Sequence, residues 1–162
     1  HIHPLEFSLI ISAAVGSHSD ITERSFMPSA SVTGRRLCGA FKFEATAPFS
    51  AFRYCHCSRC RKASGSNYAA NLFVPETQFN WAAGESLLKR FPHPKYERFA
   101  VCFCTSCGRR MSYKINTTDK MPISARVLDA VPEMRRSNSI FWKSKSAWHI
   151  SPHKLPKLDE HK

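Results

Sequence analysis

The sequence predicts a mainly β protein whose strands are built around cysteine-containing turns. Apolar and polar residues alternate in several short runs, a pattern with the two-residue period of a half-buried strand. Ten prolines punctuate the chain and favour loops between these runs. No segment keeps the period of a long amphipathic helix, although residues 130–136 could hold one helical turn.

The individual strands are predicted from local pattern, in order along the chain. Residues 40–45 and 50–54 alternate apolar with polar side chains, as a strand with one buried face does. Residues 71–75 form a short apolar run that ends at a proline. Further candidate strands are residues 85–91, 99–103, 111–115, 123–128, 139–142 and 147–150.

The chain of 162 residues is long enough for one domain with a hydrophobic core. We expect residues 27–162 to form that domain and residues 1–26 to be a leader or an added extension outside the fold. The apolar stretch at residues 5–15 lacks the basic segment that precedes a signal-peptide core, and Met27 would be a natural start. No apolar run approaches the ~20 residues needed to span a membrane.

The formal net charge of +12 suits an anionic small molecule, an acidic surface or nucleic acid. The basic residues are scattered, however, and a solvated basic face would give the same total. They cluster beside cysteines only at residues 59–62 and 109–110. The chain has no dedicated basic arm, so we do not expect nucleic acid as the partner.

The seven cysteines form two clusters and one isolated position. Residues 55–60 read CHCSRC and residues 102–108 read CFCTSCG, whereas Cys38 stands alone. Thiolates two or three residues apart can converge on one tetrahedral zinc ion, and an odd number of cysteines does not suit a disulfide framework. This arrangement favours metal binding in a reducing compartment, and we expect a cytoplasmic protein.

Cys55, Cys57 and Cys60 can occupy three corners of a zinc ion. A fourth corner left open to water or substrate would make the site catalytic, whereas a fourth protein ligand would make it structural, and the spacing allows both. His56 lies between two of these cysteines and would point away from their metal in an extended segment. We therefore expect it beside the ligands or at the surface.

The second cluster contains a knuckle formed by Cys104 and Cys107. Gly108 follows the last cysteine and permits the turn that brings backbone N–H groups to the sulfurs. Cys38, which precedes Gly39, is the natural third ligand from a distant strand. A fourth ligand remains to be identified.

Five segments in a fixed order carry a resemblance to a known family. They are residues 34–40 (GRRLCGA), 55–65 (CHCSRCRKASG), 103–108 (FCTSCG), 128–129 (LD) and 144–148 (SKSAW). Together they resemble the glutathione-dependent formaldehyde-activating enzymes, a family that also contains centromere protein V. The resemblance covers about residues 32–158. It implies a β-tent of small antiparallel sheets with two zinc ions, one structural and one catalytic.

Carried over to this sequence, the resemblance assigns Cys38, Cys104 and Cys107 to the structural zinc. The family pattern places another cysteine where this chain has Arg36, whose guanidinium has no lone pair for a metal. Cys102 would share a strand face with Cys104, and we hypothesise that it replaces the missing thiolate. The alternatives are a three-cysteine site closed by water, or no zinc at this site.

The resemblance also implies the reaction and the catalytic site, which consists of Cys55, Cys57 and Cys60. The reaction joins glutathione and formaldehyde into S-(hydroxymethyl)glutathione, and its reverse is a carbon–sulfur lyase reaction. Zinc could deliver the thiol as thiolate, which we favour, or polarise the aldehyde oxygen. The residues expected to bind glutathione are Arg59, Arg61, Lys62, Lys145 and Trp148.

Other readings of the same sequence remain open. The five expected glutathione-binding residues could instead be surface cations and a core tryptophan, and Asp129 could order a turn. A close variant is the same enzyme site acting on another small carbonyl or thioether, because the departure at Arg36 suggests divergence and Ser139 also stands where the family often has histidine. A non-enzymatic zinc module that binds protein or nucleic acid is the alternative from a different class.

Overall fold

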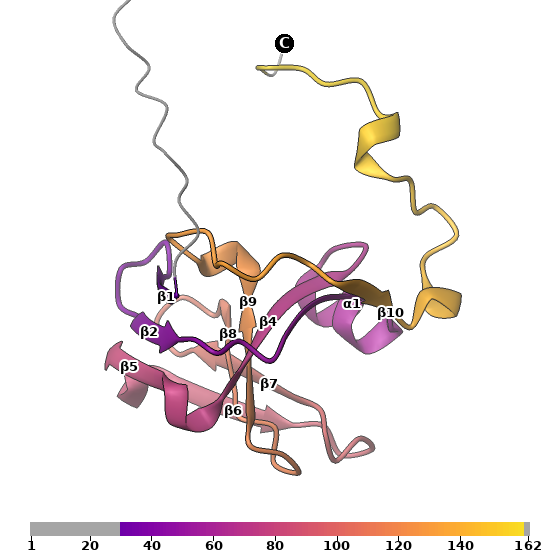
Figure 1. Ribbon diagram of the computed structural model, residues 1–162. Helices are drawn as coiled ribbons and strands as arrows, with labels where there is room; N and C mark the ends of the chain where they lie inside the picture. Colours follow the sequence, from indigo (N-terminus) through magenta and orange to yellow (C-terminus); the bar gives the residue numbers. More distant parts are fainter. Residues whose placement is uncertain (1–29, 161–162) are drawn as a thin grey trace, which may run out of the picture.

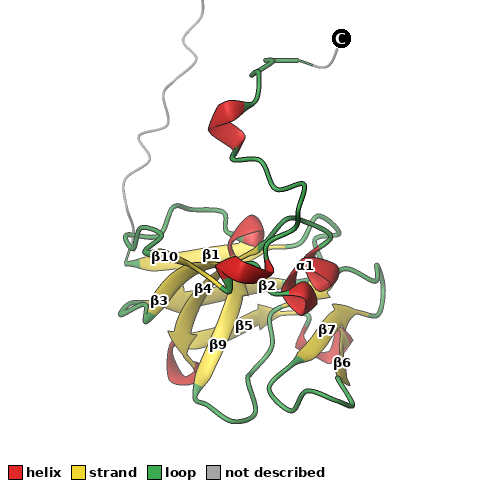
Figure 2. Cartoon of the chain, turned by 90° about the vertical axis from the view of Figure 1, so that its right-hand side faces the viewer, coloured by secondary structure: helices red, strands yellow, loops and turns green. Residues whose placement is uncertain are grey.

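The computed structural model describes residues 30–160, so the predicted extension at residues 1–26 lies outside the described residues. In the described part, ten short strands form three small sheets, and a single seven-residue α-helix lies at their side (Figures 1 and 2). The prediction of a mainly β fold is therefore confirmed. None of the described helices is long and apolar enough to cross a membrane.

The first sheet contains β1 (Ser31–Arg35), β2 (Lys42–Thr46) and β5 (Phe79–Ala83), with β2 in the centre. All its pairs are antiparallel. Buried and exposed residues alternate along β1 and β2, as the pleat requires when one face packs on a core. The turn between β1 and β2 carries Arg36 and Cys38.

The second sheet has the order β10-β3-β4-β9, formed by β3 (Ala51–Cys55), β4 (Ala69–Pro75), β9 (Lys120–Ser124) and β10 (Asn138–Ile140). The β3–β4 and β4–β9 pairs are antiparallel, but β10 pairs with β3 in parallel. The expected wholly antiparallel arrangement is corrected here. A parallel neighbour needs a long connection, and most of the chain separates β3 from β10.

The third sheet is antiparallel and contains β6 (Leu88–Pro92), β7 (Ala100–Cys104) and β8 (Arg110–Met111). The turn between β7 and β8 holds Cys107. Gly108 in this turn has a φ of 68°, a left-handed conformation that glycine adopts without a steric penalty. This geometry agrees with the knuckle predicted from the sequence.

Two apolar clusters form the core. One contains Val32, Phe43, Leu72 and Ile123 and joins the first sheet to the second. The other includes Phe41, Cys102, Cys104, Met111 and Tyr113 and packs against the third sheet. Trp81 of β5 packs against both clusters, so the three sheets share one continuous hydrophobic core.

The α-helix α1 (Ser58–Ser64) follows β3 directly and has no counterpart among the predicted elements. Cys57 caps it, because its side chain accepts a hydrogen bond from the backbone N–H of Cys60, and Gly65 ends it with a φ of 61°. No residue of α1 is buried. The helix therefore carries no apolar stripe that a sequence pattern could detect.

Several strand predictions differ from the structure. No strand forms at residues 147–150 and no helix at 130–136. Of the predicted strand 111–115, only Met111 lies in a strand, as the last residue of β8. β1 and β5 have no counterpart among the predicted strands. The 3-10 helix Pro152–Lys154 lies on a segment that runs away from the sheets (Figure 1).

Candidate metal centres and the adjoining cavity

The first cysteine group lies where β3 gives way to α1. Cys55 ends the strand, Cys57 caps the helix and Cys60 lies in its first turn. Their three sulfurs lie within 4.8 Å of one another, and the sulfurs of Cys55 and Cys57 are 3.6 Å apart. A zinc ion with sulfur ligands at about 2.3 Å requires sulfurs about 3.8 Å apart, so this donor set fits zinc.

Cys55 and Cys60 of the first cysteine group have pKa values shifted in opposite directions. A hydrogen bond from the Cys60 thiol is the largest cause that lowers the pKa of Cys55 to about 6, against the opposing effect of burial. The same contact with Cys55, together with burial, raises the pKa of Cys60. Near neutral pH the metal-free group thus holds a thiolate at Cys55 and a thiol at Cys60.

A cavity of about 810 Å³ opens beside the first cysteine group, and all three of its cysteines line it. One acidic residue, Glu97, lies in its wall. The wall also contains eight basic residues: Arg36, Arg53, Arg59, Lys95, Arg98, Arg109, Arg110 and Arg126. Such an excess of positive charge favours an anionic ligand.

Of the five residues expected to bind glutathione, only Arg59 lines this cavity, where its guanidinium lies 4.2 Å from the ring centre of Tyr96. Arg61 instead donates from Nε to the carbonyl oxygen of His56 at 3.1 Å. Lys145 lies over the ring of Trp142, whereas Trp148 is 67% exposed. Lys62 is also exposed.

The sequence patterns did not predict most of the residues in the cavity wall. Tyr96, Arg98 and Phe99 come from the connection between β6 and β7, which carries no motif. Arg109 and Arg110 did carry a signal, because they form one of the two basic clusters beside cysteines. Asp129 does not line this cavity; it forms an ion pair with Arg35 at 3.4 Å.

His56 is buried, with 1% of its surface exposed, so the surface alternative for it is wrong. Its ring packs against Trp142, His149 and Tyr68, with centroid distances of 4.9, 5.3 and 5.5 Å. Burial lowers the pKa of His56, and the neighbouring His149 lowers it further. Through these contacts the segment after β10 packs against His56, the residue between the ligand candidates Cys55 and Cys57.

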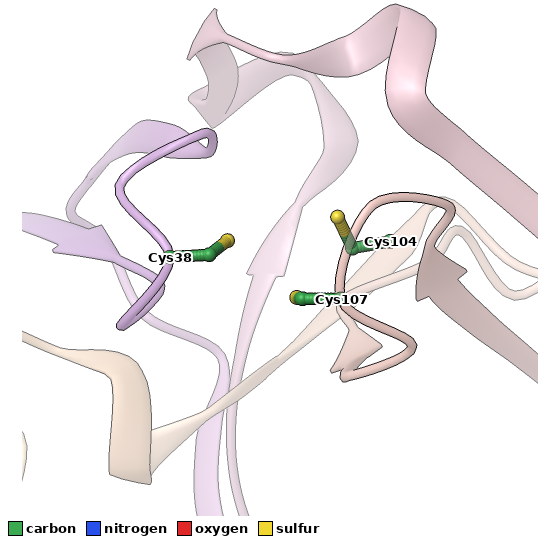
Figure 3. A group of neighbouring side chains, drawn as sticks. All are labelled: Cys38, Cys104 and Cys107. Carbon is green, nitrogen blue, oxygen red and sulfur yellow. The ribbon is translucent and has the colours of Figure 1, made fainter.

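The second cysteine group joins two turns that are distant in sequence. Cys38 projects from the β1–β2 turn toward Cys104 and Cys107 of the β7–β8 turn (Figure 3). Their sulfurs lie within 4.8 Å of one another. Burial raises the pKa of Cys104, but the backbone N–H groups of Cys107 and Ser106 outweigh it, so that pKa is lowered. The group therefore also suits a thiophilic metal.

Cys102 lies outside this second group among the described residues, so the geometry does not support it as the missing ligand. It faces the core from within β7, as Cys104 does, and the expectation of a shared face is correct. Its backbone is paired on both sides, to Arg90 of β6 and Met111 of β8, and its thiol packs in the core beside Phe41 and Met111. Burial instead raises the pKa of the Cys102 thiol.

Arg36 occupies the place that the family pattern gives to a cysteine. Its Nε donates to the Sδ of Met111 at 3.0 Å, and the residue lines the large cavity. Burial lowers the pKa of Arg36, the thiols of Cys107 and Cys38 oppose that shift, and the nearby Arg109 and Arg126 add to it. Arginine nevertheless remains charged at neutral pH.

The fold and the two cysteine groups define a β protein with two thiol-rich centres that could each hold a metal ion. The profile of the family described as "Glutathione-dependent formaldehyde-activating enzyme" matches residues 31–144, more than half of the chain. The chain belongs to this family, and the resemblance seen in the sequence is confirmed.

A crystal structure of a Rhodobacter sphaeroides protein, from a Northeast Structural Genomics project, is similar to this chain. The two share 19% sequence identity with a TM-score of 0.52, over 66% of this chain and 98% of that chain. This similarity shows a common fold. No curated protein sequence gives a significant match.

Proposed function

We propose that this protein joins glutathione and formaldehyde into S-(hydroxymethyl)glutathione and, in reverse, acts as a carbon–sulfur lyase. One observation carries the proposal: the sulfurs of Cys55, Cys57 and Cys60 line a basic cavity large enough for a small thiol substrate. No fourth His, Cys or carboxylate joins these three among the residues from 30 to 160. A metal held there would keep a free corner facing the cavity.

The three cysteines would hold zinc, which when bound keeps a substrate thiol in its reactive thiolate form at neutral pH. The first cysteine group is pre-arranged for this role, since the backbone turn between β3 and α1 already brings its sulfurs together. Cys55 is a thiolate near neutral pH in the metal-free protein, so one of the three ligands is already deprotonated before a cation binds.

The cavity wall supplies binding and orientation. Glutathione carries two carboxylates and one ammonium group, and the wall offers eight cations with one carboxylate, Glu97. Arg59 is held over Tyr96 beside the cysteine group, which fixes one cation close to the reacting thiol. Holding both reactants in one cavity replaces an encounter in solution by a unimolecular step.

The reaction is an addition that conserves all atoms. The thiol sulfur forms a bond to the formaldehyde carbon, the electron pair of the C=O π bond moves to oxygen, and that oxygen takes a proton equivalent to the one the thiol released. The reverse reaction breaks the same carbon–sulfur bond. No oxidant or reductant is consumed.

The test is the rate at which glutathione and formaldehyde interconvert with S-(hydroxymethyl)glutathione at equilibrium. NMR measures this rate with the zinc-loaded protein. We expect acceleration by the native protein and its loss in Cys57→Ser. Cys102→Ala is the matched control, because it removes an equally buried sulfur outside both cysteine groups. A metal-loaded native protein without acceleration would overturn the proposed reaction.

A further inference from the structure

Arg36 links the second cysteine group to the large cavity. It belongs to the turn that presents Cys38, and its guanidinium lines the same cavity as Cys55, Cys57 and Cys60. The resemblance to the family implies a cysteine at this position. Arginine there removes a possible ligand from the second cysteine group and adds a charged group to the wall of the cavity beside the first.

The fold brings Arg126 beside Arg36. The end of β1 is tied to the segment after β9 by a bridge between Gly34 and Leu128, and the Asp129 N–H donates to the Thr33 carbonyl at 2.9 Å. Arg126 lies on the 3-10 helix of this segment, Ala125–Val127. Both arginines thus enter the cavity wall from adjoining backbone.

Arg109 reaches the same wall from the β7–β8 turn, which also carries Cys107. Met111, two residues beyond Arg109, accepts the hydrogen bond from Arg36 Nε and so ties the two turns together. Arg36, Arg109 and Arg126 consequently line one cavity from three segments that are distant in sequence.

These three side chains have no acidic partner in the part of the chain that the structure describes: none of them forms an ion pair there. Arg126 donates one N–H to the Ser64 carbonyl at 3.1 Å, and the Nη groups of Arg36 make no hydrogen bond within residues 30–160. Guanidinium groups with free N–H donors match the paired oxygens of a carboxylate or a phosphate.

We propose that Arg36, Arg109 and Arg126 form an oxyanion site that binds the carboxylate or phosphate end of the substrate. Arg36 is its principal member, because it is half-buried and its charge is screened less than those of the exposed Arg109 and Arg126. The substrate role of this site rests on the proposed function, but its affinity for an oxyanion does not. The site sets specificity by selecting a substrate with a negative end.

The first experiment measures binding of inorganic phosphate by ³¹P NMR titration of the zinc-loaded protein at constant ionic strength. We expect Arg36→Gln to weaken this binding about tenfold or more, as the loss of a charge-assisted contact does. Arg35→Gln is the matched control, because Arg35 is its exposed neighbour, pairs with Asp129 and does not line the cavity. Equal effects of the two variants would overturn the oxyanion site.

A second titration identifies the source of the oxyanion. Phosphate displaced by glutathione, but not by glutathione esterified at its glycine carboxylate, would assign the site to that carboxylate. Phosphate binding that depends on Arg36 but is displaced by neither compound would assign the oxyanion site to a phosphate-bearing substrate. That result would keep the oxyanion site and overturn glutathione as the substrate. Unchanged phosphate binding in Arg36→Gln would overturn the site itself.

Discussion

The backbone around each cysteine decides whether its sulfur can join a metal centre. Cys57 caps α1 and accepts the Cys60 N–H at 3.4 Å, and Cys104 receives backbone N–H groups from the turn that follows it. Cys102 has strand residues on both sides, and its backbone is paired to Arg90 and Met111. It remains an apolar core residue while its neighbour two positions away can serve as a ligand.

Cys102→Ala tests this difference directly. We expect the variant to keep its full zinc content and to lose about 1 kcal/mol of unfolding free energy, since only a small buried group is removed. Cys104→Ala should instead lose zinc. Metal content by mass spectrometry under native conditions distinguishes the two, and zinc loss from Cys102→Ala would restore Cys102 as a ligand.

The low pKa of Cys55 gives a pH-dependent reactivity in the metal-free protein. Its folded pKa of about 6 lies below the ordinary thiol value of 9.0, so its thiolate persists at pH 7 and is lost only as the pH falls through 6. We expect alkylation of Cys55 by iodoacetamide, followed by mass spectrometry, to show a midpoint near pH 6. Cys60→Ala should move the midpoint upward, because the Cys60 thiol is the main stabilising partner.

At the scale of secondary structure, Gly34 positions β1, because the atoms around it leave no room for a side chain. A Cβ at Gly34 would overlap both the Phe43 ring on β2 and the Val127 carbonyl after β9. This close approach permits the bridge between Gly34 and Leu128. The position of Arg36, two residues further on, depends on that contact.

Gly34→Ala should therefore destabilise the fold by about 2 kcal/mol, the cost typical of an overpacked core. Thr33→Ala is the matched control, since Thr33 is exposed on the same strand and should change the unfolding free energy by about 0.5 kcal/mol or less. Denaturant unfolding measures both. Equal stabilities would show that β1 and the segment after β9 separate without cost.

At the scale of the whole molecule, the second cysteine group connects the first sheet to the third through their turns. Cys38 and Cys107 are exposed, so this connection lies at the surface, where a metal held by the three sulfurs would strengthen it. Removing zinc by a chelator should lower the melting temperature by about 10 °C, as the loss of a tightly bound metal does. Calorimetry checks this, and an unchanged melting temperature would contradict it.

Arg36→Cys changes both sites of the molecule at once. The added thiol would complete a four-cysteine set with Cys38, Cys104 and Cys107, so we expect zinc release to a chelator to slow about tenfold or more. The same variant should lose phosphate affinity, because the guanidinium is gone. Faster or unchanged zinc release would show that position 36 does not face the second cysteine group.

The spacing of residues close in sequence was sufficient to predict much of this protein. The alternation along β2 and β3 predicted strands, and the knuckle sequences predicted the group of Cys55, Cys57 and Cys60 and the pair Cys104 and Cys107, because local backbone geometry brings such neighbours together. Cys38 joins that pair from a distant turn, as the resemblance to the family implied. The short helix α1 escaped prediction because it buries nothing, and the parallel pairing of β10 depends on a long connection.

Only the tertiary structure decided what surrounds the first cysteine group. The cavity wall combines residues as distant in sequence as Arg36, Arg59, Tyr96 and Arg126, and no local pattern records which of them meet. The sequence by itself determined the family, the mainly β class and the two sets of thiols. Long-range packing of the three sheets determined that Cys102 is core and that Arg36 lines the cavity. It also lined the cavity with arginines that form no ion pair within residues 30–160. Such contacts arise between segments rather than within them, so no local pattern predicts them.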